Sequence, residues 1–210
     1  MSAALTPLLE LTQPSGDAEP ELAALARLAA AGVRLAPIRV VPAPAEETFY
    51  RLNNLPAQLS ALFAGLDLSD PDEDDLEDRV DAAQGLLKRH FLLDEFVDLF
   101  YAGLSGLPER VRVRRANTPA ETPAGRVVSR GRPALLAVKD AWTDDWAFDA
   151  LWRRVRAGHT VALAARAILL TPPAQDDAGD AEAGRASGLL GRPVRLLHDP
   201  SFGVTGVRFL

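Results

Sequence analysis

The chain has 210 residues, of which 48% are hydrophobic and 25% are charged, and its formal net charge is -6. This length predicts one domain or two closely packed subdomains, and the composition is that of a folded globular protein. The acidic excess disfavours nucleic acid as a partner, because phosphate groups would meet a mostly repulsive field. The absence of cysteine excludes disulfides, cysteine-ligated metals and thiol catalysis.

The amino-terminal segment, residues 1–13, lacks the basic and apolar regions of a signal peptide. No later segment approaches the roughly 20 consecutive apolar residues that a membrane-spanning helix needs. We therefore expect a cytoplasmic protein without a membrane partner.

Apolar residues at helical spacing predict a first half that is mainly helical. An acidic block at residues 67–81 precedes one of these helices, where carboxylates favour the helix dipole. Because the block lacks the spacing of a calcium loop, we interpret it as a solvated helix start and not as a metal site. The predicted helices are Glu21–Ala31, Ala45–Asn54, Leu55–Leu66, Pro71–His90 and Asp94–Tyr101, with an extended segment at Val33–Val41.

Strand patterns dominate the second half of the chain. One long helix, Lys139–Arg156, interrupts them, and its three tryptophans are expected in the core. A segment near 174–187, rich in Asp, Ala and Gly, is expected to be a mobile loop. The predicted strands are Arg110–Arg115, Gly125–Ser129, Ala134–Val138, Val161–Leu170, Arg192–Leu197 and Thr205–Leu210, the last two as a terminal hairpin.

Together these patterns predict an α/β fold of the α+β type. A mainly helical subdomain, residues 1–108, is followed by an α/β subdomain, residues 109–210, with a mixed and mainly antiparallel sheet packed against the Trp-rich helix. The histidines His90, His159 and His198 have no paired ligand spacing, so we predict no metal site and no catalytic residue. His198 and Asp199 are interpreted as part of a surface turn.

The arginines of Arg110–Arg115 are the most distinctive local feature. Alternation along a strand places Arg110, Arg112 and Arg114 on one face, where guanidinium groups can bind phosphate with two parallel hydrogen bonds. The alternative is a solvated edge strand whose basic side chains discourage pairing with other chains. Our candidate residues for binding an anion or a phosphate are Arg112, Arg114 and Arg115.

The order of these segments resembles the N-terminal nucleotide-binding region, which is ATP-grasp-like, of the phosphoenolpyruvate synthase and pyruvate phosphate dikinase family. The resemblance covers about residues 16–170, and its markers lie at residues 21–25, 32–37, 113–118, 137–142 and 161–170. In that family a Lys in the first helix and an Arg in a Val-Arg-Ser-Ser segment contact nucleotide phosphates. Here Glu21 stands at the position of the Lys, Arg114 matches the Arg, and Arg115 and Ala116 replace the serines.

Three hypotheses follow from this resemblance and its departures. The first is a non-catalytic, degenerate nucleotide-binding domain that binds a ligand or a protein partner. The second is the ATP-binding subunit of a split phosphotransferase, which would use Mg-ATP and a partner protein that supplies the missing half of the site. The third is a nucleic-acid-binding accessory protein that uses the arginine strand, which the acidic composition makes the weakest.

Overall fold

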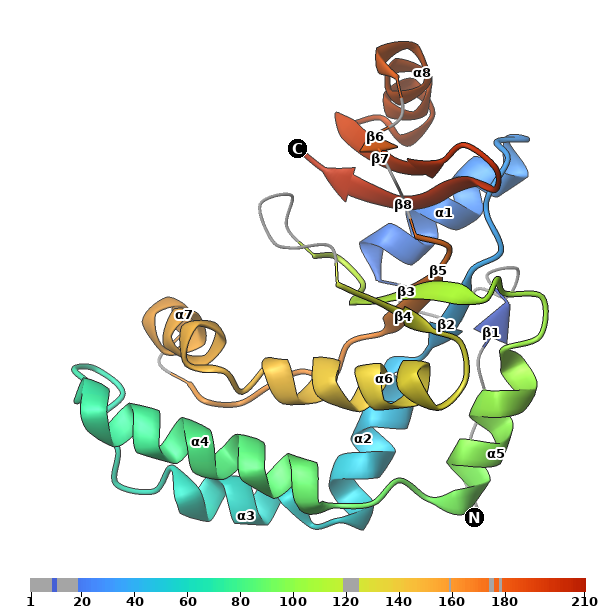
Figure 1. The fold of residues 1–210 in the computed structure, drawn as a ribbon. Helices are drawn as coiled ribbons and strands as arrows, with labels where there is room; N and C mark the ends of the chain where they lie inside the picture. The colour runs from blue at the N-terminus through green and yellow to red at the C-terminus, as the bar shows by residue number, and fades with distance from the viewer. Residues whose placement is uncertain (1–8, 11–18, 119–124, 159, 174–175, 178) are drawn as a thin grey trace.

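In a computed structural model of the chain, the described residues are 9–10, 19–118, 125–158, 160–173, 176–177 and 179–210. They form eight helices and two sheets, in which every pair of neighbouring strands is antiparallel (Figure 1). The prediction of a mixed α/β fold with mainly antiparallel strands is therefore confirmed. None of the helices among these residues has both the length and the apolar character needed to cross a membrane.

The larger sheet has five strands in the order β1-β2-β5-β3-β4. Its central strand is β5, in which all four residues are buried. Strands from both sides of residue 108 contribute to this one sheet. Their bounds are β1 Leu9–Glu10, β2 Arg39–Val41, β3 Arg110–Arg115, β4 Arg126–Ser129 and β5 Ile168–Thr171.

Helices cover one face of this sheet and enclose the larger hydrophobic core, which we call the helical core (Figure 1). It includes Val111 and Val113 of β3, Ile168 and Leu170 of β5, and the fully buried Trp142. The helices are α2 Ala43–Leu52, α3 Leu55–Leu62, α4 Glu73–Arg89, α5 Asp94–Gly103, α6 Arg132–Asp144 and α7 Phe148–Gly158.

The opposite face packs against helix α1 and a three-stranded sheet, which enclose a second core, here the hairpin core. Leu25 and Leu28 of α1 meet Leu169 of β5 and the apolar residues Leu196 and Val204 of the hairpin. The elements are α1 Pro20–Ala30, β6 Asp176–Asp177, α8 Asp180–Leu190, β7 Val194–Asp199 and β8 Gly203–Phe209. The terminal hairpin predicted from the sequence is thus present as β7 and β8.

Local chemistry explains several helix ends. The Asp72 carboxylate caps α4 by accepting a hydrogen bond from the backbone N–H of Asp75 at 2.9 Å, and the acidic residues that follow are exposed. The interpretation of the acidic block as a solvated helix start is confirmed. Helix α1 is followed by Gly32 with φ +80°, a left-handed conformation that glycine adopts without steric cost.

Four predicted segments differ from the structure. The segment Ala134–Val138 is not a strand, because Gly131 and Pro133 start helix α6 before it. All its residues except the exposed Leu136 are buried in the helical core. The single helix predicted over Lys139–Arg156 is divided into α6 and α7 by a turn in which the Trp146 N–H bonds to the Thr143 carbonyl at 2.9 Å.

The predicted strand over Val161–Leu170 is also shorter, since regular pairing begins only at Ile168. The segment near 174–187, expected to be a mobile loop, contains the start of helix α8. Asp180 and Glu182 lie in the first turn of that helix, where the dipole favours negative charge, and Gly191 ends it.

Candidate functional site

Arg114 is buried and forms an ion pair with Glu21. Its Nη1 and Nη2 atoms donate to the two carboxylate oxygens of Glu21 at 2.9 and 2.6 Å. Nη2 also donates to the carbonyl of Thr205 at 3.3 Å, while Glu21 accepts the backbone N–H groups of Asn117 at 2.8 Å and Val207 at 3.1 Å. Both Glu21 and Arg114 are therefore already bound to groups of the protein itself.

The start of α1 is fixed against the end of β3 by a second set of contacts. The Asn117 side chain accepts the backbone N–H of Glu21 and donates to the Glu19 carboxylate, both at 2.8 Å. Glu19 also accepts the backbone N–H of Ala167, which precedes β5. Asn117 has φ +55°, the left-handed conformation that asparagine tolerates better than most residues. This turn brings Glu21 against Arg114.

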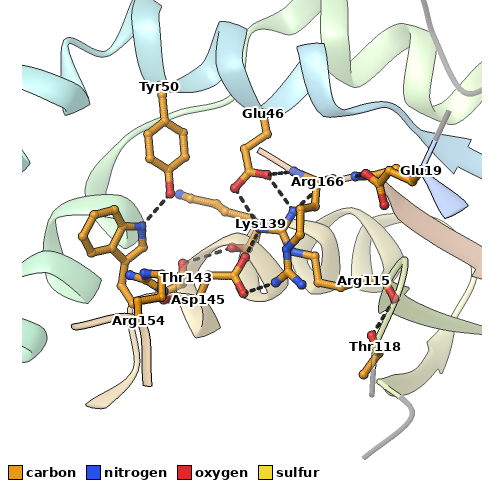
Figure 2. Close-up of polar contacts among 12 residues, drawn as sticks. Glu19, Glu46, Tyr50, Arg115, Thr118, Lys139, Thr143, Asp145, Arg154 and Arg166 are labelled. Carbon is orange, nitrogen blue, oxygen red and sulfur yellow. Dashed lines mark hydrogen bonds and ion pairs between the residues drawn. The ribbon is translucent and has the colours of Figure 1, made fainter. Parts of the chain in front are cut away.

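Arg115 points to the other side of the sheet and lies in a second buried network (Figure 2). Its guanidinium donates to the two carboxylate oxygens of Glu46 on α2 at 2.6 and 2.7 Å. It also contacts the Asp145 carboxylate at 2.5 Å and the Arg166 carbonyl at 2.7 Å. Arg166 in turn donates to Asp145 at 2.6 Å.

The three predicted anion-binding arginines have different surroundings: Arg114 and Arg115 both line the pocket described below, but Arg112 is not among its lining residues. Arg114 lies toward the hairpin core and Arg115 toward the helices, while Arg112 is partly buried on β3. The alternative interpretation, a solvated edge strand, is wrong, because β3 pairs with β5 on one side and β4 on the other. Anion binding by Arg112, Arg114 and Arg115 stays a prediction.

Burial changes the acid–base properties of this region. Loss of hydration raises the pKa of the Glu46 carboxyl, although hydrogen bonds and charge from Arg115 act in the opposite direction. Burial likewise raises the pKa of Glu19. The hydroxyl of Tyr50 accepts a hydrogen bond from the indole N–H of Trp146 at 2.7 Å, and burial raises its pKa as well.

A pocket of about 580 Å³, which we call the arginine pocket, lies between β3, the segment before β5, and helices α6 and α7. Pockets of about 300 to 1,000 Å³ are typical of small-molecule sites. Apolar side chains form much of its wall, and six of its lining residues are arginines. These arginines are Arg114, Arg115, Arg126, Arg153, Arg154 and Arg166.

Carboxylates neutralise some of these arginines and not others. Exposed Arg126 binds Asp140 and Asp144 of α6 at 2.5 and 2.8 Å. The Nε of Arg153, by contrast, donates to the backbone carbonyl of Asp149 at 3.0 Å. Arg154 donates from Nη1 to the Asp145 carbonyl.

The guanidinium of Arg154 also lies over the ring of Trp146, with its carbon 5.2 Å from the ring centroid. Its Nε and Nη2 atoms are buried and have no hydrogen-bond partner within the described part of the chain. Burial lowers the pKa of this guanidinium. Across the same described residues, neither Arg153 nor Arg154 forms an ion pair with a carboxylate, although the charge of Asp145 acts on Arg154.

Sequence reasoning did not identify Arg153 and Arg154. Two adjacent arginines in an amphipathic helix usually indicate a solvated surface, and the local pattern does not show that α7 turns toward the sheet. The charge excess at the end of the helix, Arg153, Arg154 and Arg156, was the only available signal.

The remaining predicted residues lie elsewhere. The surface-turn interpretation of His198 and Asp199 is wrong, because both residues belong to strand β7 and Asp199 is buried. The Asp199 carboxylate accepts the backbone N–H groups of Ser201 and Phe202 in the turn that follows the strand. His90 ends α4, and His159 lies outside the described residues. Among the residues that the structure describes, no group of three or more His, Cys, Asp or Glu side chains is arranged to hold a metal ion.

Neither a scan against protein-family models nor a search of curated proteins finds a match to this chain.

Proposed function

We propose that this chain is a non-catalytic domain that acts by binding, a degenerate relative of the ATP-grasp-like nucleotide-binding region of phosphoenolpyruvate synthase. The observation that carries the proposal is the buried pair between Glu21 and Arg114, joined by hydrogen bonds of 2.6 and 2.9 Å. The resemblance places a phosphate-binding Lys at the position of Glu21. A carboxylate there repels phosphate and holds the arginine that would otherwise bind it.

Energetics support the same proposal. Removing one partner of a buried ion pair typically costs about 3 to 5 kcal/mol, because the other charge stays buried without compensation. A hydrogen bond to a charged group contributes about 1.5 to 3 kcal/mol. A phosphate that displaced Glu21 from Arg114 would therefore not recover the cost through that contact alone.

The first experiment measures turnover. The purified chain is incubated with Mg-ATP and pyruvate, and the release of ADP, AMP and phosphate is followed. We expect rates equal to those of buffer. Turnover that Arg114→Lys abolishes would contradict the proposal, because that variant keeps the charge of Arg114 but loses its paired hydrogen bonds.

The second experiment measures thermal unfolding with and without Mg-ATP. A ligand at 100 times its dissociation constant stabilises the folded state by about 2.7 kcal/mol. Because Glu21 holds Arg114, we expect Mg-ATP to cause no such stabilisation by binding to Arg114. The matched variant is Glu21→Gln, which keeps an oxygen to accept the N–H of Val207 and removes the negative charge. A shift in the wild-type protein that this variant enlarges would contradict the proposal and favour the split phosphotransferase.

A further inference from the structure

We propose that the arginine pocket binds a small amphipathic anion, meaning one carboxylate or phosphate group joined to an apolar body. This inference goes beyond the proposed function, which names neither the site nor the ligand. Arg153 and Arg154 would bind the charged group, and the apolar wall would contact the rest of the molecule.

The charge balance of the pocket supports an anionic group. Carboxylates hold Arg115, Arg126 and Arg166, as described above, and Glu21 holds Arg114. The charges of Arg153 and Arg154 have no such partner among the described residues, and Arg154 has two buried nitrogens without any acceptor. An oxyanion in the pocket would bind the exposed Arg153 guanidinium, and the charge of Arg154 beside it would strengthen the attraction. Hydrogen bonds between guanidinium and oxyanion are among the stronger ones in proteins.

The acidic residues of the pocket do not oppose this binding. Asp144 and Asp145 both line it, but Arg126 binds Asp144 at 2.8 Å, and Arg115 and Arg166 bind Asp145 at 2.5 and 2.6 Å. Each negative charge is thus already neutralised by a neighbouring guanidinium.

The shape and lining of the pocket specify the apolar part of the ligand. Small side chains leave room above the sheet, which is why a cavity of about 580 Å³ exists beside helices that are otherwise closely packed. A ligand with only a charged group would leave this surface in contact with water, whereas an apolar body would bury it. The apolar lining includes Val113, Ala137, Ala141, Ala150, Leu163 and Ala164.

Helix α7 holds the two arginines on a rigid support. Leu151 and Val155 of this helix are buried in the helical core, and Arg154 is stacked on buried Trp146. Positively charged groups that are already fixed in place lose less entropy when they bind an anion.

The test compares four probes by isothermal titration calorimetry: octanoate, octyl phosphate, octanol and inorganic phosphate. We expect at least one of the two amphipathic anions to bind, and octanol and inorganic phosphate to bind at least about tenfold more weakly. The stronger of octanoate and octyl phosphate identifies the charged group. Equal affinity for octanol and the anions, or binding of neither anion at millimolar concentration, would overturn the inference.

Variants of α7 locate the binding. Arg153→Gln and Arg154→Gln should each weaken binding of the better anion about tenfold or more, since each removes a charged hydrogen-bond donor. The matched control is Arg156→Gln in the same helix, because Arg156 lies over the ring of Trp152 and does not line the pocket. An equal loss in all three variants, or no loss in the first two, would overturn the inference.

Folding is checked by thermal unfolding of each variant. Arg153 is exposed, so Arg153→Gln should unfold like the wild-type protein and carries the test even if Arg154→Gln is unstable. The outcomes are separate from those for the proposed function. ATP turnover would contradict the proposed function without affecting this binding, and failure of the anions to bind would leave the Glu21–Arg114 argument unchanged.

Discussion

Arg114 and Arg115 are neighbours in β3, and each fixes a carboxylate from a different helix on a different side of the sheet. The ion pair of Glu21 with Arg114 links α1 to β3, and the ion pair of Glu46 with Arg115 links α2 to β3. Both glutamates are almost completely buried, with 1% and 2% of their surfaces exposed. At this scale two ion pairs, and not apolar contacts alone, determine where the two helices meet β3.

The cost of breaking the first pair is the first prediction. Arg114→Met should lower the free energy of unfolding by about 3 to 5 kcal/mol, because Glu21 would remain buried without its countercharge. The double variant Glu21→Gln/Arg114→Met should recover part of this loss, since Gln is neutral and still accepts the backbone N–H groups. Urea unfolding measures both, and a loss below about 1 kcal/mol for Arg114→Met would contradict the burial argument.

The second prediction concerns pH and Glu46. Burial raises the pKa of this carboxyl above 4.5, so the folded state binds the proton more tightly than the unfolded state does. The contribution of this titration to stability is therefore complete below pH 4.5 and is lost as the pH rises through the folded pKa.

Two measurements test whether the pKa of Glu46 is raised in the folded state. Carboxyl ¹³C titration should place the Glu46 transition above 4.5. The destabilisation caused by Glu46→Gln, measured by urea unfolding, should be smaller at about pH 8 than at about pH 5, because only the wild-type protein loses this contribution. A destabilisation that grows with pH would show that the folded pKa is lowered.

At the scale of elements, the sequence predicts best where local chemistry decides the structure. The acidic block at residues 67–81 and the alternation in Arg110–Arg115 each indicate an element that the structure contains. The segment Ala134–Val138 is ambiguous because a short apolar run is compatible with both a strand and a buried helix. The turn from Gly131 and Pro133 resolves the ambiguity in favour of α6.

The candidate site was less predictable for a different reason. Arg114 and Glu21 lie 93 positions apart, and Arg115 and Glu46 lie 69 apart, so no local pattern relates them. The sequence identified Arg114 and Arg115 as unusual but could not show that their partners are inside the protein. The arginine pocket depends on how α6 and α7 pack on the sheet, which is likewise a nonlocal property.

Strand β8 provides the third prediction, at Gly206. A Cβ atom there would lie 2.2 Å from Nη2 of Arg114 and 3.0 Å from Oε1 of Glu21, so Gly206→Ala must displace the buried pair. We expect the free energy of unfolding to fall by about 1 to 3 kcal/mol, as is typical when a packed site receives an extra methyl group.

The control is Gly188→Ala in α8, where an added Cβ meets nothing within 4 Å. Because alanine favours helices more than glycine does, this change should stabilise the protein by about 0.5 to 1 kcal/mol. Urea unfolding distinguishes the two variants. If Gly206→Ala were as stable as the wild-type protein, close packing around the pair would not be needed for stability.

At the scale of the molecule, the two cores share the central strands. Ile168 and Leu170 of β5 face the helical core, while Leu169 faces the hairpin core. Ala116, which follows β3, also belongs to the hairpin core. Because the same strands form part of both cores, their loss from one core would expose the apolar residues of the other core to water. The molecule is therefore expected to unfold as one cooperative unit.

This expectation is the fourth prediction. Trp142 and Trp146 lie in the helical core and Trp152 packs against it, so tryptophan fluorescence reports on that side of the sheet. Far-UV circular dichroism reports on the helices and strands of both sides. In urea the two transitions should have the same midpoint within error, and separate midpoints would indicate that the cores unfold independently.

The position of β5 at the centre of the larger sheet also affects how the protein is made. Strand β2 leaves the ribosome early, but its Arg39–Val41 pairs with Ile168–Thr171, which are synthesised much later. Until then the apolar residues of both cores have no completed sheet to cover them, a condition that favours aggregation and proteolysis. Nascent or truncated chains that end before Ile168 should therefore depend on chaperones, and a chain must include Ile168–Thr171 before it can acquire the native sheet.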